Sequence, residues 1–235
     1  MMVEPHFYET EKQVAIELTK YLIKKMQESD RPFYLAISGG STPNLLYSLW
    51  GFEYATAIPW QQLHLFWVDE RCVPPTDPES NFGNMKQRCL NKITFPIENL
   101  HRIHGEAPPA LEAERYSLEV QNTVPMIDGI PQFDMIVAGM GNDGHTSSIF
   151  PGQTELLTER RPYVVSIHPG TQQARIAMTG PTMMAAKELI FHVVGKEKLP
   201  LVHAMLFRYN PTDVLLPALY ISKNANNTLL FSDLS

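Results

Sequence analysis

Short β-rich runs alternate with longer helical patterns along most of this chain, and no other feature of the sequence limits its fold as strongly. Continuous apolar runs at 33–38, 63–70 and 133–141 predict buried strands. Apolar residues recur at helical spacing elsewhere, most clearly over 10–29 and 107–124. This alternation is typical of βαβ units, in which helices cover a parallel sheet. We therefore expect an α/β fold with a mostly parallel sheet.

Shorter patterns predict the remaining elements. Thr42, followed by Pro43, is predicted to cap and begin a helix over 42–50. Further helices are predicted over 80–90, 180–188 and 196–207, and further strands over 163–168, 175–179, 189–195 and 227–234. The sequence contains no internal repeat, low-complexity tract or long linker, so we expect one domain spanning residues 1–235.

Composition and charge narrow the class of partner. A net charge of −6 argues against a nucleic-acid binder or a protein attracted to anionic membranes, but it permits a local positive pocket for a small anion. No apolar stretch approaches the roughly 18 residues of a transmembrane helix. Residues 1–13 lack the basic and apolar regions of a signal peptide. We expect a cytoplasmic protein that is a monomer or a weak homo-oligomer.

The cysteines, histidines and serines contain no familiar metal, redox or nucleophile motif. Cys72 and Cys89 form no CxxC pair, which predicts two reduced thiols. No HxH or HExxH pattern occurs among the 8 histidines, so we expect no metal site and no other cofactor. The absence of a GxSxG elbow argues against a serine nucleophile.

Ligands of open parallel sheets gather beyond the carboxyl ends of the strands, so the segments that follow strands are the candidates for a site. The first is SGGSTP, residues 38–43, which leads into a helix N-terminus, where unpaired N–H groups and the helix dipole favour an anion such as phosphate. Its candidate phosphate-binding residues are Ser38, Gly39, Gly40, Ser41 and Thr42. The alternative is a plain glycine-rich turn, and the missing GK[ST] excludes a Walker A loop.

The second segment is VDER, residues 68–71. Asp69, Glu70 and Arg71 place both signs of charge at the end of a buried strand. The alternative is a solvated corner held by salt bridges. We therefore leave open whether these side chains act on a ligand or only on each other.

The third segment is GMGNDGHTSS, residues 139–148. Its three glycines permit the backbone to approach a ligand closely. His145 has an ordinary pKa near 6.5, so the imidazole can act as a base near neutral pH. A lone histidine is more often structural, but its place in a glycine-rich loop after a strand favours a functional role.

Together, SGGSTP, VDER, SNFG and GMGNDGHTSSIFPG, in this order, resemble the 6-phosphogluconolactonase family, within the larger group that includes glucosamine-6-phosphate deaminase and ribose-5-phosphate isomerase. The segments 174–198 and LPALY (216–220) are similar to later family motifs. The resemblance implies a three-layer α/β/α fold. It also implies metal-free hydrolysis of 6-phospho-D-glucono-1,5-lactone to 6-phosphogluconate, in the oxidative pentose phosphate pathway, with catalysis by the histidine of GHT.

For this reaction we expect the following roles for individual residues. His145 is the general base for water, Arg71 adds positive charge, and Asp69 or Asp143 orients the imidazole, with no choice between the two from sequence. Arg175 and Lys198 match the family's phosphate-binding Arg and Lys, although Lys196 is an alternative to Lys198 and ordinary solvation an alternative for each. The candidates for supporting the oxyanion in the loop are Gly141, Gly144 and Thr146.

Two other functions remain open. A glucosamine-6-phosphate deaminase carries an Asn–Glu pair shortly after its loop histidine, whereas this chain has Ile149 and Phe150 near that place and no carboxylate before Glu155. This difference favours the lactonase. A sugar-phosphate-binding regulator that has lost catalysis is the second alternative, and the intact His145 and VDER argue against it. The C-terminal portion, 222–235, is short, and the family's helical tail is scarcely visible there.

Overall fold

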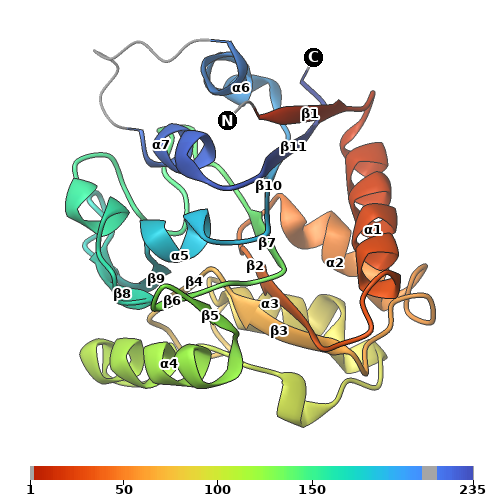
Figure 1. Ribbon diagram of the computed structural model, residues 1–235, viewed down its shortest axis with the longest axis horizontal. Coiled ribbons are helices and arrows are strands. Elements are labelled where there is room, and N and C mark those ends of the chain that lie inside the picture. Colours follow the sequence, from red (N-terminus) through yellow and green to blue (C-terminus); the bar gives the residue numbers. More distant parts are fainter. Residues whose placement is uncertain (1–2, 208–215, 235) are drawn as a thin grey trace.

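The computed structural model describes residues 3–207 and 216–234 (Figure 1). Its centre is a six-stranded sheet in the order β1-β11-β10-β7-β2-β3, in which every pair of neighbours is parallel. In that order the strands are Glu4–Phe7, Thr228–Ser232, Glu188–Val193, Met135–Ala138, Phe33–Ile37 and Leu63–Trp67. The predicted α/β fold with a mostly parallel sheet is confirmed.

Helices cover both faces of this sheet, which makes three layers (Figure 1). On one face lie α1 (Glu11–Gln27) and α2 (Pro43–Gly51), with α3 (Asn81–Arg88) beside α2. On the other lie α5 (Gly180–Met184) and α7 (Pro217–Asn224), with α6 (Leu199–Leu206) packed on α7. Short 3₁₀ turns occur at Leu90–Lys92, Ile97–Asn99, Thr154–Leu157 and Lys196–Lys198.

Helix α1 shows how the sequence pattern produces these layers. Thr10 caps its N-terminus by accepting a hydrogen bond from the Gln13 N–H. Leu18, Leu22 and Met26 follow at four-residue spacing and are almost fully buried against the sheet.

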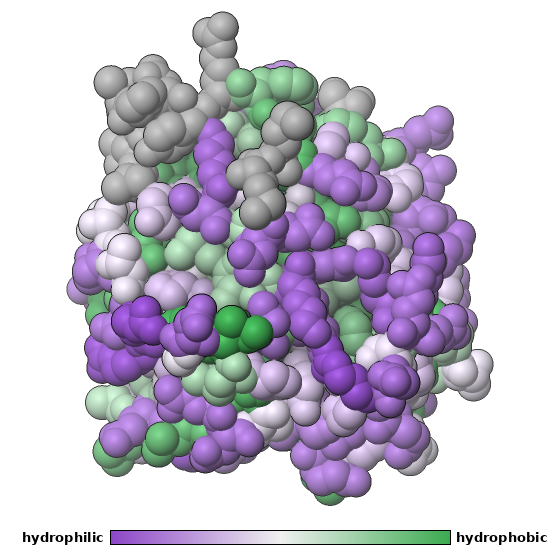
Figure 2. Space-filling model, in the orientation of Figure 1, coloured by the Kyte–Doolittle hydropathy of each residue, from purple (hydrophilic) through white to green (hydrophobic). Residues whose placement is uncertain are grey.

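None of the described helices has the length and apolar character required to cross a membrane. Figure 2 shows a largely hydrophilic face with apolar residues in small groups.

A second, smaller sheet lies beside the first and is antiparallel, in the order β4-β9-β8. Its strands are Asp69–Arg71, Ala174–Met178 and Tyr163–Ile167, and α4 (Pro109–Thr123) packs on β8. A short hairpin joins β5 (Met126–Ile127) to β6 (Ile130–Pro131). The single strand predicted over 63–70 is therefore wrong, because the chain leaves the central sheet after Trp67 and Asp69 pairs with Ala177 instead.

Three further predictions need correction. The strand predicted over 133–141 ends at Ala138, so the glycines that follow it are loop. Thr42 has helical backbone angles and makes no side-chain cap, so its predicted N-cap hydrogen bond is absent. Helix α5 ends at Met184, short of the predicted 188, because Glu188 already belongs to β10. The sequence analysis did not predict strand β1 or helix α7.

Candidate active site

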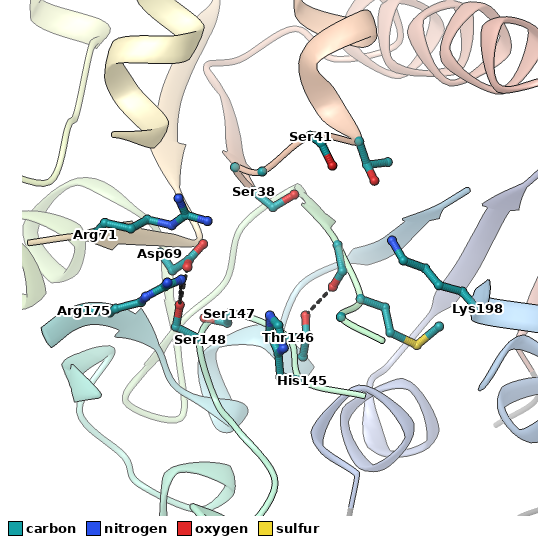
Figure 3. Close-up of a pocket in the computed structure, with 16 residues that line it drawn as sticks. Ser38, Ser41, Asp69, Arg71, His145, Thr146, Ser147, Ser148, Arg175 and Lys198 are labelled. Atoms are coloured by element: carbon teal, nitrogen blue, oxygen red, sulfur yellow. Dashed lines mark hydrogen bonds between the residues drawn. The ribbon is translucent and has the colours of Figure 1, made fainter. Parts of the chain in front are cut away.

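A cavity of about 230 Å³ lies where the carboxyl ends of β2 and β7 meet the second sheet (Figure 3). Its walls include predicted residues from all three strand-end segments and from the later motifs: Ser38, Gly39, Gly40, Ser41, Thr42, Asp69, Arg71, Gly141, His145, Thr146, Arg175 and Lys198. Asp143 and Gly144 lie outside this lining. The cavity therefore gathers side chains that are more than 100 residues apart in the chain.

The loop after β2 forms one wall. The Ser38 N–H donates to the Val137 carbonyl at 2.9 Å, which ties the loop to β7, and the Tyr47 hydroxyl donates to the Ser38 carbonyl. Gly40 has a φ of +94°, a conformation that favours glycine. Thr42 makes no cap hydrogen bond, so its hydroxyl is available to an anion, whereas Pro43 has no N–H and the Asn44 N–H donates to the Ser41 carbonyl at 3.1 Å.

His145 lies on the opposite wall and is held by Asp143. The Nδ1 atom of His145 is 2.6 Å from the Asp143 Oδ1, and the same oxygen accepts the His145 N–H at 3.1 Å. The hydrogen bond from His145 lowers the pKa of Asp143, so this carboxyl is ionised at neutral pH. A proton on Nδ1 then faces the carboxylate, and Nε2 is left to accept another. Gly141 is needed beneath the ring, because a Cβ there would lie 2.2 Å from Nδ1.

The structure distinguishes the two candidate partners of the histidine. Asp69 accepts hydrogen bonds from the Ser148 hydroxyl and, at 3.5 Å, from the Asn81 amide, and no hydrogen bond joins it to His145. Asp143, two residues before His145 in the same turn, is the carboxylate in contact with the imidazole. Sequence alone left this choice open, because both residues follow strands that end at the same edge of the molecule.

The expected oxyanion donors in the glycine loop are not free. The Gly141 N–H donates to the His145 carbonyl at 2.9 Å, and the Gly144 N–H donates to the Gly141 carbonyl at 3.0 Å. The Thr146 hydroxyl donates to the Gly139 carbonyl at 2.8 Å. The prediction that the amides of Gly141 and Gly144 can donate to a ligand is therefore wrong, because both close the turn that presents His145.

Two serines that the sequence analysis did not single out also line the cavity. Ser147 and Ser148 have φ values of +52° and +53°, unusual for residues with a side chain. The Ser147 hydroxyl bonds the Met178 carbonyl at 2.8 Å, and the Ser148 hydroxyl bonds Asp69, so both hold the loop against the second sheet. The hydroxyl-rich run HTSS was the available signal, but its anchors lie far away in the chain.

Three cations face the cavity: Arg71 from β4, Arg175 from β9 and Lys198 from the opposite side (Figure 3). Burial, followed by the charge of Arg71, lowers the pKa of Arg175, and burial lowers the pKa of Lys198. Among the described residues, none of the three has a carboxylate within 4.0 Å. Lys196 is exposed and does not line the cavity.

The two arginines use only some of their side-chain N–H donors within the protein. Arg71 donates to the Glu79 carbonyl at 2.8 Å, and Arg175 contacts the Ser148 hydroxyl at 3.4 Å. Their buried Nε atoms have no partner within the described part of the chain. Buried donors without partners are costly, so the fold holds both guanidinium groups at the cavity without satisfying all of their donors. In the same part of the chain no group of three or more His, Cys, Asp or Glu side chains could hold a metal ion.

Comparison with known proteins agrees with this arrangement. The family model for glucosamine-6-phosphate isomerases and 6-phosphogluconolactonases matches residues 9–230. The chain is 37% identical to the 6-phosphogluconolactonase of Treponema pallidum over 83% of this chain and 81% of that protein. It is 42% identical to the 6-phosphogluconolactonase of Haemophilus influenzae over 72% of this chain and 71% of that protein.

Solved structures give the same picture. The crystal structure of a devB protein matches with a TM-score of 0.92 and 35% identity, covering 98% of this chain and 96% of that one. The 6-phosphogluconolactonase from Trypanosoma cruzi matches with a TM-score of 0.85 and 25% identity, covering 98% and 94%. A monomeric glucosamine-6-phosphate deaminase, at 18% identity and a TM-score of 0.79, shares the fold.

Proposed function

The chain belongs to the family of glucosamine-6-phosphate isomerases and 6-phosphogluconolactonases, and on this premise we propose that it hydrolyses 6-phospho-D-glucono-1,5-lactone to 6-phosphogluconate with His145 as general base. The observation that carries the proposal is the pairing of His145 with Asp143 at a cavity whose three cations lack carboxylate partners among the described residues. A base and an anion-binding wall in one cavity suit a phosphorylated ester.

In the proposed reaction His145 acts first as a base and then as a proton donor. Nε2 of His145 takes a proton from water as the water oxygen bonds to the lactone C1. Asp143 stabilises the resulting imidazolium. The C1–ring oxygen bond then breaks, and the proton on Nε2 passes to the ring oxygen, which becomes the hydroxyl of the product. The new carboxylic acid releases its own proton to solvent at neutral pH.

In this proposal the phosphate binds against the Ser38–Thr42 loop, and the positions of Arg175 and Lys198 on two sides of the cavity support this (Figure 3). The Thr42 hydroxyl and the dipole of α2 favour an anion there, Arg175 supplies a planar fork of donors and Lys198 a point charge. Arg71 stands beside Arg175 and adds positive potential where the carbonyl oxygen becomes negative. This role replaces the one first expected of the glycine amides.

The two alternatives make different demands on the site. A deaminase needs further carboxylates to shuttle protons, but Ile149 and Phe150 are buried and apolar, and Asp69 is the one carboxylate among the described residues that line the cavity. A regulator would bind the sugar phosphate without turnover. We also infer action in the cytoplasm, in the oxidative pentose phosphate pathway, for which the free thiols of Cys72 and Cys89 are supporting evidence.

Proton release from freshly made 6-phosphogluconolactone tests the proposal. The His145→Gln variant should lose about a hundredfold to ten-thousandfold in kcat, the usual contribution of a general base. His203→Gln, which changes an exposed histidine of α6, is the matched control and should behave as the wild type. Near-normal turnover by the His145 variant would refute the base assignment. Turnover of glucosamine 6-phosphate in a parallel assay would instead support the deaminase.

A further inference from the structure

Glu70 is a buried carboxylate between two residues of the cavity wall, and the mechanism above does not use it. Glu70 is only 1% exposed to solvent. Its Oε1 accepts the N–H groups of Arg71 at 2.7 Å and Asn81 at 2.8 Å. Its Oε2 accepts the Phe82 N–H at 2.8 Å and the Ser80 hydroxyl at 3.1 Å. One side chain thus joins strand β4 to the first turn of α3.

Asn81 extends this connection to the rest of the cavity. Its side-chain amide donates to the backbone carbonyl of Asp69, the residue before Glu70, at 2.8 Å. Its side chain also packs on the loop after β2, since a Cβ on Gly39 would lie 1.8 Å from the Asn81 Oδ1. The segments VDER and SNFG are therefore two halves of one buried unit that contacts the glycine loop.

The contacts of Glu70 favour its ionised form. Three of the four partners are backbone N–H groups, which only donate, and the fourth is the Ser80 hydroxyl, which also accepts from the Gly83 N–H. The start of α3 also favours a negative charge. Burial opposes ionisation and, although the three backbone N–H groups act against it, raises the pKa of Glu70 to about 7.

The charged or titratable groups that face Glu70 come from three segments. Asp69, Arg71 and Cys72 belong to its own segment, Tyr47 to α2 and Arg175 to β9. Among them only the two arginines carry positive charge, and both line the cavity. The charge of Glu70 therefore acts on one cation of the cavity wall, Arg175, as well as on Tyr47 and Cys72.

We propose that Glu70 is a positioning residue: together with Asn81 it holds Asp69, Arg71 and the Gly39 loop in one arrangement, without touching the substrate. The kinetic part of this inference rests on the proposed lactonase activity. The glycine loop binds the phosphate, so its displacement weakens substrate binding, and Arg71 faces the developing oxyanion, so its displacement also slows the chemical step.

Glu70→Gln tests this role because it keeps the shape and removes the charge. At pH 8 we expect KM to rise about tenfold or more and kcat to fall by a smaller factor, since the amide nitrogen cannot accept from the α3 N–H groups and both the glycine loop and Arg71 are displaced. Glu114→Gln, on the exposed side of α4, controls for loss of a carboxylate. Leu22→Ala, in the core of α1, controls for loss of stability. Both controls should keep the wild-type KM once folded protein is assayed.

Amide NMR spectra give a second readout that needs no activity. Glu70→Gln should shift the resonances of Gly40 and Ser41, across the Asn81 contact, whereas Glu114→Gln and Leu22→Ala should leave them in place. Unmoved loop resonances, or a KM equal to that of Leu22→Ala, would overturn the positioning role. A wild-type protein without lactonase activity would contradict the proposed function alone, and the loop resonances would still decide the role of Glu70.

Discussion

The two ends of the central sheet use the same kinds of charged residue in opposite ways. At the amino ends of β2 and β7, Asp134 accepts the Tyr34 N–H at 3.0 Å and contacts both Arg31 and, at 3.0 Å, Lys187. Beside it, Glu188 bonds Lys25 at 2.5 Å. At the carboxyl ends, Arg71, Arg175 and Lys198 have no such partner within residues 3–207 and 216–234.

Both ends carry a cavity, so a hollow by itself does not identify a binding site. What differs is the charge balance of the walls. Paired charges at the amino ends stabilise the fold and leave no demand for a ligand, whereas unpaired buried cations at the carboxyl ends are costly until an anion arrives. The predictions that follow contrast the two ends, in order of falling effect.

The largest effect is expected from the support of the base at the carboxyl ends. Asp143→Asn should lower kcat about a hundredfold or more, because the amide can present its N–H₂ to Nδ1 and favour the wrong tautomer of His145. KM should change little. Steady-state proton-release kinetics would measure both values. A kcat within threefold of the wild type would show that Asp143 does not orient the imidazole.

Arg175→Met should weaken substrate binding without weakening the fold. We expect KM to rise about 10- to 100-fold, as for loss of a hydrogen bond to a charged group. The free energy of unfolding should stay level or rise by about 1 kcal/mol, because a buried cation without a partner carboxylate is removed. Kinetics and urea unfolding together check this. A clear loss of stability with unchanged KM would make Arg175 structural and remove the contrast.

Asp134→Asn should show the reverse pattern at the amino ends. We expect kcat/KM to stay within twofold of the wild type and the free energy of unfolding at pH 7 to fall by about 1–3 kcal/mol, because a buried acceptor of charged donors is lost. Urea unfolding measures the loss, with Asp30→Asn at an exposed carboxylate nearby as the control. Impaired catalysis in the Asp134 variant would contradict the division between the two ends.

The same carboxylate gives this prediction a pH dependence. Burial alone raises the pKa of Asp134, but the hydrogen bonds from Arg31, the Tyr34 N–H and Lys187 outweigh it, so the folded-state pKa lies below the ordinary value of 3.8. Its contribution to stability is complete above that ordinary value and is lost as pH falls through the folded-state pKa. The stability difference between wild type and Asp134→Asn should therefore shrink in acid below about pH 4.

The smallest effect is expected from the pair of lysines after β10. Lys198→Met should raise KM about three- to tenfold, because a half-buried cation at the cavity is lost, while the exposed Lys196→Met should leave KM unchanged. Their comparison in one assay removes the effect of losing a positive charge in general. Equal KM values for the two variants would show that neither lysine binds the phosphate.

Sequence reasoning predicted well which residues line the cavity and poorly which of them contact one another. Strands β2 and β7, which are followed by SGG and GMG, are parallel neighbours in one sheet, so the loops that follow them lie at the same edge. Sequence reasoning could not decide whether Asp69 or Asp143 contacts the His145 imidazole, because this depends on how the loop after β7 folds. It also missed the antiparallel sheet, since the apolar run through Val68 continues while its hydrogen-bonding partner changes from β2 to β9.

The sequence by itself determined the parallel α/β layers, the edge where ligands gather, and His145 with its glycine turn, because local periodicity, glycines and strand ends are properties of short segments. Only the tertiary structure decided that Asp143 holds the imidazole, that the glycine amides are already bonded, and that Arg71 and Arg175 stand together without a carboxylate. Hydrogen bonds and charge balance depend on which distant residues are brought within a few ångströms, and that proximity exists only once the chain has folded.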